Sequence, residues 1–150
     1  MSNNEVIFIL NGLVETCERG ERGFRSAAES VRNSEFRRLF NIFAQQRTQF
    51  ISELQAEIHR LGGEAGKTGR PEASSAPSPI PFSFSRPSSP EARDEAAIIA
   101  ECQREQEAAV NDYQEALKAN LPLDVQYVVK RQYMDIKDAY DRIRILQRAA

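Results

Sequence analysis

The chain has 150 residues, of which 41% are hydrophobic and 28% are charged, and its formal net charge is −2 at pH 7. This size and balance predict one globular domain, over residues 1–150, with a core of its own. A chain so close to neutral lacks the basic surface that binds nucleic acid or an anionic membrane, so we expect neither as a partner. No apolar run approaches the roughly 20 residues of a membrane span.

The start of the chain, MSNNEVIF, lacks the basic stretch that opens a signal peptide. The two cysteines, Cys17 and Cys102, lie far apart in the sequence and do not form a disulfide framework. Both observations favour a cytoplasmic protein, because the cytoplasm keeps thiols reduced.

Two long segments in the first half of the chain show helical periodicity. Ser2 and Glu5 have the spacing of a capping box, so a first helix is expected over residues 3–32. A second helix is expected over residues 34–61, where a pair of glycines ends it. The apolar positions, mostly three, four or seven residues apart, are Val6, Ile9, Leu10, Leu13, Cys17, Phe24, Ala27 and Val31 in the first segment, and Phe36, Leu39, Phe40, Phe43, Phe50, Leu54, Ile58 and Leu61 in the second.

A connection rich in proline and serine follows, over residues 62–89. Antiparallel neighbours usually need only about 2–8 connecting residues, so this length predicts a crossover that travels the length of a helical bundle. Ile80, Phe82 and Phe84 alternate within it, as in an extended strand with one face held down. We expect these three residues to anchor the crossover on the bundle. The alternative is that they form a docking motif for a protein partner.

The second half of the chain predicts another helical hairpin. Ser89, Pro90 and Glu91 combine a capping serine, a proline at the first helical position and an acid in the first turn. Helices are therefore expected over residues 90–119 and 123–147. Their faces are Ile99, Cys102, Gln106, Ala109, Tyr113 and Ala116 in the third helix, and a heptad seam of Val125, Val129, Gln132, Ile136, Ala139, Ile143 and Leu146 in the fourth.

Two antiparallel helical hairpins joined by a long crossover have the topology of a ferritin-like four-helix bundle, so the expected fold class is all-α. A coiled-coil oligomer is the structural alternative. We rank it lower because four amphipathic segments in one chain can cover one another's apolar faces.

Four segments carry a family resemblance, in order along the chain: LNGLVETCERGERGFRSAAE, QRTQFISELQAEIHRLGGE, YQEALKANLP and QYMDIKDAYDRIRIL. They resemble a bacterial family of uncharacterised ferritin-like proteins, known only as a domain of unknown function. The resemblance covers nearly the whole chain except residues 67–90. The resemblance implies a four-helix bundle that self-associates. We therefore expect a homo-oligomer, and specifically a dimer. The resemblance implies no settled activity.

Ferritin-type di-iron sites take a Glu from each of two helices and a Glu-x-x-His from each of the other two. Bacterioferritins and rubrerythrins resemble this chain in layout, so their ligand positions can be matched to it. The matching residues are Glu15, Gln46-x-x-Gln49, Glu105 or Glu107, and Lys137-x-x-Tyr140. Both histidines are missing, and a lysine, which cannot bind a cation, replaces a carboxylate. The only histidine, His59, is expected on the surface near the end of the second helix.

We therefore expect no metal and no other cofactor, with di-iron or another divalent metal as the alternative. A weaker site made of carboxylates alone would use Glu15, Glu53, Glu101 and Glu105, because hard cations accept oxygen ligands. The simpler interpretation of these glutamates is a set of solvated charges on helix faces. The two cysteines lie on apolar faces and are expected to be buried and inert.

No phosphate-binding loop, metal-spaced Cys/His cluster or nucleophile elbow occurs in the sequence, and no catalytic residue is predicted. The expected function is a non-catalytic structural or interaction role, on a ferritin-like scaffold with a degenerate di-metal site. The alternative is a ferritin-like or rubrerythrin-like oxidoreductase or metal-handling protein that binds iron or manganese. A third hypothesis is an oligomeric adaptor that presents the crossover, with Phe82 and Phe84, to a partner.

Overall fold

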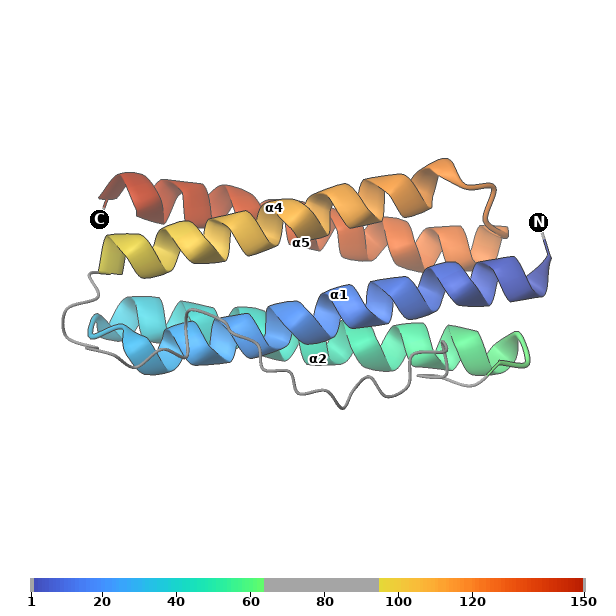
Figure 1. Cartoon of the computed structure of the whole chain (residues 1–150), viewed down its shortest axis with the longest axis horizontal. Coiled ribbons are helices and arrows are strands. Elements are labelled where there is room, and N and C mark those ends of the chain that lie inside the picture. The colour runs from blue at the N-terminus through green and yellow to red at the C-terminus, as the bar shows by residue number, and fades with distance from the viewer. Residues whose placement is uncertain (1, 64–94, 150) are drawn as a thin grey trace.

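The computed structural model describes residues 2–63 and 95–149, and these form four α-helices and no strand (Figure 1). The helices are α1 (Asn3–Ser30), α2 (Ser34–Arg60), α4 (Glu95–Lys118) and α5 (Leu123–Ala149). They pack lengthwise as two hairpins, α1 with α2 and α4 with α5, and α1 also lies against α4 (Figure 1). The all-α four-helix bundle expected from the sequence is confirmed.

The direction of α4 confirms the crossover topology. Figure 1 shows α4 starting at the end of the bundle where α2 also starts, so α2 and α4 run parallel. A hydrogen bond fixes this junction, because the Asn33 backbone N–H donates to the Glu95 carboxylate at 2.9 Å. The end of α2 and the start of α4 therefore lie at opposite ends of the bundle. Ile80, Phe82 and Phe84, the expected anchors, lie outside the described residues.

The helix ends follow from local side-chain chemistry. At the start of α1 the Glu5 N–H donates to Ser2 Oγ at 3.2 Å, and the Ser2 N–H donates to Glu5 Oε1 at 2.9 Å. Asn33 caps α2 by accepting from the Glu35 N–H at 2.8 Å. Gly62 ends α2 with φ at +90°, a left-handed conformation that glycine adopts without strain.

The core consists of two apolar clusters stacked along the bundle axis. One surrounds Leu10, Phe50 and Val129, and the other surrounds Phe24 and Phe40. Along each of three helices the residue between the two clusters is not an ordinary apolar one: it is Gly20 in α1, Arg47 in α2 and Gln106 in α4. The centre of the bundle is therefore polar, and it is the place to look for a site. None of the described helices combines the length and the apolar character needed to span a membrane.

Candidate functional site: a polar layer in the bundle interior

The middle of α2 places an arginine inside the core. Arg47 is 1% exposed, and its neighbours on the same helix face, Phe43 and Phe50, are also buried. Its guanidinium lies over the Phe24 ring, 5.5 Å from the ring centroid. One terminal nitrogen donates to Oε1 of Gln106 in α4, whereas Nε and Nη1 have no hydrogen-bond partner. Its partner is thus a neutral amide, not the carboxylate that usually accompanies a buried guanidinium.

The positive charge of Arg47 is permanent in practice. Burial lowers the pKa of its guanidinium, while the nearby Cys17 and Tyr113 groups act in the opposite direction. The ordinary pKa of arginine is so high that the group stays protonated at neutral pH. The interior of the bundle therefore holds a fixed cation.

α1 provides the space that this cation needs. A Cβ atom placed on Gly20 would lie 2.0 Å from Arg47 Nη1 and 2.9 Å from its Cζ, well inside contact distance. Any other residue at this position would therefore displace the guanidinium. Gly12, in the same helix, has nothing within 4 Å of the corresponding point, so it is not tied to the buried charge.

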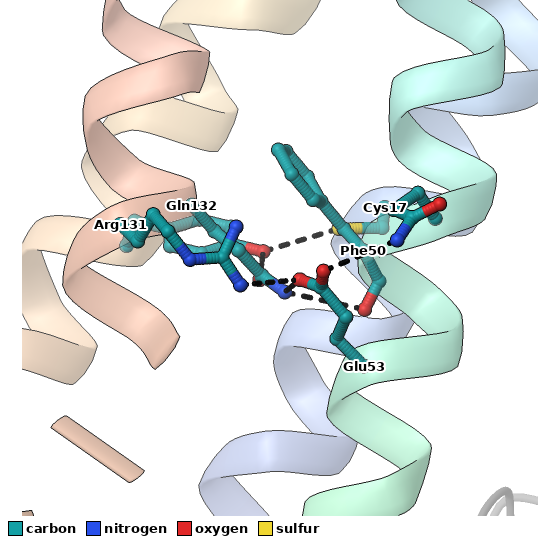
Figure 2. Close-up of polar contacts among 7 residues, drawn as sticks. Cys17, Phe50, Glu53, Arg131 and Gln132 are labelled. Atoms are coloured by element: carbon teal, nitrogen blue, oxygen red, sulfur yellow. Dashed lines mark hydrogen bonds and ion pairs between the residues drawn. The ribbon is translucent and has the colours of Figure 1, made fainter. Parts of the chain in front are cut away.

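A chain of hydrogen bonds forms the second half of the polar layer (Figure 2). Tyr113 Oη donates to Gln132 Oε1 at 2.7 Å, and Gln132 Nε2 donates to Glu53 Oε1 at 2.9 Å and to the Phe50 carbonyl at 3.3 Å. Cys17 Sγ lies 3.2 Å from Tyr113 Oη. Because the one tyrosine proton is given to Gln132, the Cys17 thiol must be the donor in that contact.

This chain leads from the buried centre to the surface between α2 and α5. Glu53, at its outer end, also accepts a hydrogen bond from Arg131 at 3.0 Å (Figure 2). The Gln132 amide in the middle has no titratable proton, so the chain orients its members and does not conduct protons. Its effect is to tie α1, α2, α4 and α5 together through one side-chain network.

The buried thiols and the buried phenol are all held in their neutral forms. Burial raises the pKa of the Cys17 thiol, although Arg47 works in the opposite direction. Burial also raises the pKa of Cys102, to about 12, and raises that of Tyr113 well above its ordinary value. The two cysteines are 0% and 2% exposed. They match the expectation of buried thiols, and their neutral forms are poor nucleophiles and poor metal ligands.

Glu53 gives a pH-dependent test of this network. Burial opposes its ionisation, but the hydrogen bonds from Gln132, Arg131 and Gln49 together outweigh that effect and lower the pKa of its carboxyl. A lowered acid pKa stabilises the fold above the unfolded-state pKa of about 4.3, and this stabilisation is lost as pH falls through the folded-state value.

We therefore expect Glu53→Gln to reduce the free energy of unfolding by about 1 kcal/mol at pH 7, a difference that shrinks towards zero in acid. Urea titrations between pH 7 and pH 3 measure it. Glu115→Gln is the control, because it breaks an ion pair with Lys118 in which both side chains are 74% exposed. If the loss of unfolding free energy in Glu53→Gln were the same in acid as at pH 7, the lowered pKa assigned to Glu53 would be contradicted.

The four glutamates considered as candidate ligands lie apart. Glu15 is exposed beside a groove of about 370 Å³ between α1 and α4. Glu53 faces α5, Glu101 pairs with Arg104 at 3.7 Å, and Glu105 pairs with Arg19 of α1 at 3.7 Å. Across residues 2–63 and 95–149 the structure brings no three His, Cys, Asp or Glu side chains together in a way that could hold a metal ion.

The matching of ligand positions to the sequence was wrong in register. Gln49 and Lys137, placed at the bundle centre by that matching, are exposed, and Gln46 is only half-buried. The residues next to them face the core instead, namely Arg47 in α2 and Ile136 and Ala139 in α5. A shift of one residue turns a helix position by about 100°, which is enough to exchange a core position for a surface one.

Comparison with known proteins finds a family model and solved structures that resemble this chain. Residues 5–76 match the model of a family described as Domain of unknown function (DUF2383). Over 97% of its length the chain superposes on a mutant of Mycobacterium smegmatis Dps1 with a TM-score of 0.78 and 11% identity, covering 96% of that protein. The chain therefore has a ferritin-like fold, and its first half is similar to this family.

A second solved structure has a similar fold. It is a two-domain protein from Anabaena variabilis that contains DJ-1/ThiJ/PfpI-like and ferritin-like domains, and it superposes on 99% of this chain with a TM-score of 0.77 and 14% identity. The chain spans 37% of the length of that protein. At these identities the likeness is one of fold. No curated protein matches the sequence.

Ferritin-like bundles can hold a metal pair in the core, so the donor groups of this interior can be tested against such a pair. The groups present are a neutral thiol, a phenol, two amides and the Arg47 guanidinium. A metal pair in such a bundle needs carboxylates to neutralise and bridge it, with histidines beside them. The Arg47 cation would repel it instead. The residues at the bundle centre do not fit a di-metal cofactor.

Proposed function

We propose that this chain is a non-catalytic ferritin-like bundle with a degenerate metal site, which acts through its surface as a structural or interaction protein and needs no cofactor. The observation that carries the proposal is Arg47. A buried guanidinium hydrogen-bonded to Gln106 puts a permanent positive charge where a metal-binding bundle keeps carboxylates.

The neutral state of the other buried groups supports the same proposal. Cys17 and Tyr113 are shielded from solvent and hydrogen-bonded to each other, so neither offers an ionised side chain to a substrate or a metal. The carboxylates of Glu53 and Glu105 are already paired with arginines at 3.0 and 3.7 Å. A metal ion would have to break those ion pairs before it could bind.

The test is the metal content of the protein, purified without added metal and again after anaerobic loading with Fe(II) and desalting. We expect far less than one metal ion per chain in both preparations, measured by elemental analysis. Glu15→Ala and Glu105→Ala are the control variants, and Glu53→Ala and Glu101→Ala cover the remaining candidate ligands. Stoichiometric metal that is lost in these variants would contradict the proposal. It would favour the alternative, a metal-handling or oxidoreductase role.

A further inference from the structure

α5 has two opposite apolar faces, and the bundle accounts for only one of them. The inner face supplies the core residues Val125, Val129, Gln132, Ile136, Ala139 and Ile143. The outer stripe consists of Leu123, Tyr127, Met134 and Ile145, which are 78%, 70%, 61% and 61% exposed. At about 100° per residue these four positions fall within roughly 40° of one another, on the side of the helix opposite the core.

This concentration is unusual for the surface of a monomer. Six large hydrophobic side chains are exposed among residues 2–63 and 95–149, and four of them form the outer stripe of α5. Single exposed apolar residues are ordinary, whereas several aligned on one helix face indicate an interaction surface, which here is interrupted by Asp138 and Asp141. The outer stripe extends over about 33 Å at 1.5 Å per residue, the length of six helical turns.

The outer stripe is symmetric about Met134. Leu123 lies eleven residues before Met134 and Ile145 lies eleven residues after it. Of the exposed charged pairs placed symmetrically between them, Lys130 with Asp138 and Asp124 with Arg144 have opposite signs, whereas Arg131 and Lys137 are both cations. When two such helices pack antiparallel with Met134 at the centre, Lys130 of each copy is level with Asp138 of the other. Parallel packing in the same register would put like charges together.

We propose that the outer stripe of α5 is the interface of a homodimer, in which two α5 helices pack antiparallel about a two-fold axis at Met134. Such an interface is isologous, because each copy presents the same surface to the other. Tyr127 and Asp141 are seven residues before and after Met134, so the tyrosine hydroxyl comes level with a carboxylate of the second copy. The proposal rests on the interaction role proposed above and names its partner, a second copy of this chain.

The two-fold axis gives a direct test of the register. In Met134→Cys the new thiols of the two copies face each other at the axis, so a mild oxidant should convert the native protein into a covalent dimer on a non-reducing gel. Asp135→Cys is the matched control, because Asp135 is exposed but is turned away from the stripe by about 100°. The native cysteines are 0% and 2% exposed and should leave the wild type uncross-linked. Equal cross-linking of the two variants would overturn the proposal.

The mass of the protein in solution gives the second test. We expect wild-type protein to sediment as a dimer, and Met134→Glu, which places two carboxylates at the axis, to raise the dimer dissociation constant by about 30-fold or more. An unchanged helical circular dichroism spectrum would show that the variant still folds. A wild-type protein that stays monomeric would overturn the proposal. If its Met134→Cys thiol also resisted a maleimide, other residues of the same chain would cover the stripe. Because these tests do not involve metal, their failure is separable from failure of the proposed function.

Discussion

Replacing Gln106 with methionine should lower the free energy of unfolding by about 1–3 kcal/mol, although the two side chains have similar volumes and no charge is removed. Gln106 Oε1 accepts the hydrogen bond that the buried Arg47 guanidinium makes, and Nη1 and Nε of that group already lack partners. Without the amide, a cation that is 1% exposed would have no hydrogen-bond acceptor at all. Urea unfolding followed by circular dichroism measures the loss.

Replacing both Arg47 and Gln106 with methionine should have the opposite effect on the free energy of unfolding. The double variant removes the buried charge along with its partner, and exchanging buried ionic groups for apolar side chains of similar size is often neutral or stabilising by about 1–4 kcal/mol. The contact of the guanidinium with the Phe24 ring, worth about 2 kcal/mol when desolvated, is lost and limits the gain. We expect the double variant to be at least as stable as the wild type.

A double variant less stable than Gln106→Met alone would contradict this balance and would show that Arg47 stabilises the bundle outright. A double variant at least as stable as the wild type, which we expect, would show that Arg47 is not there for stability. A buried cation retained against stability indicates that the polar layer specifies how the helices align, as single buried polar residues do in coiled coils. Arg47 fits this role, because its guanidinium can be accommodated only where Gly20 of α1 and Gln106 of α4 lie opposite it.

The fold could be predicted from the sequence because it depends on patterns that can be recognised without knowing which residues are in contact. The two hairpins follow from helical periodicity, and the start of α1 follows from the Ser2 capping box. The crossover follows from the length of one connection. The end of α1 was less predictable. Its last residue is Ser30, two residues before the expected end, because the next residue, Val31, is already extended.

The polar layer could not be predicted in the same way, because periodicity gives the positions of a core but not which polar residues occupy it. Cys17, Tyr113 and Gln132 were placed on core faces, yet nothing in their spacing showed that Tyr113 would connect the other two. Arg47 was missed, since arginine is rarely buried. One signal was present: the apolar face of the second helix has no member between Phe43 and Phe50, and Arg47 fills that gap.

Gly20→Ala should destabilise the bundle by about 1–3 kcal/mol, whereas Gly12→Ala should stabilise it by up to about 1 kcal/mol. Alanine is the better helix former, and at Gly12 the new methyl group meets nothing within 4 Å. At Gly20 the methyl group would lie 2.0 Å from Arg47 Nη1. The guanidinium is at the end of a flexible side chain, but packing encloses it on all sides, so it cannot move away without losing Gln106 and Phe24.

The decisive comparison is made in the Arg47→Met/Gln106→Met background, where no guanidinium remains beside Gly20. There Gly20→Ala should behave like Gly12→Ala and become neutral or stabilising, because the slimmer methionine leaves space for the methyl group and the helix-propensity gain remains. The difference between the two backgrounds is the coupling energy between Gly20 and the buried cation. A coupling near zero would show that Gly20 serves only the local path of α1. A coupling of about 2 kcal/mol would establish that α1 and α2 align through the space that one helix leaves for the charge of the other.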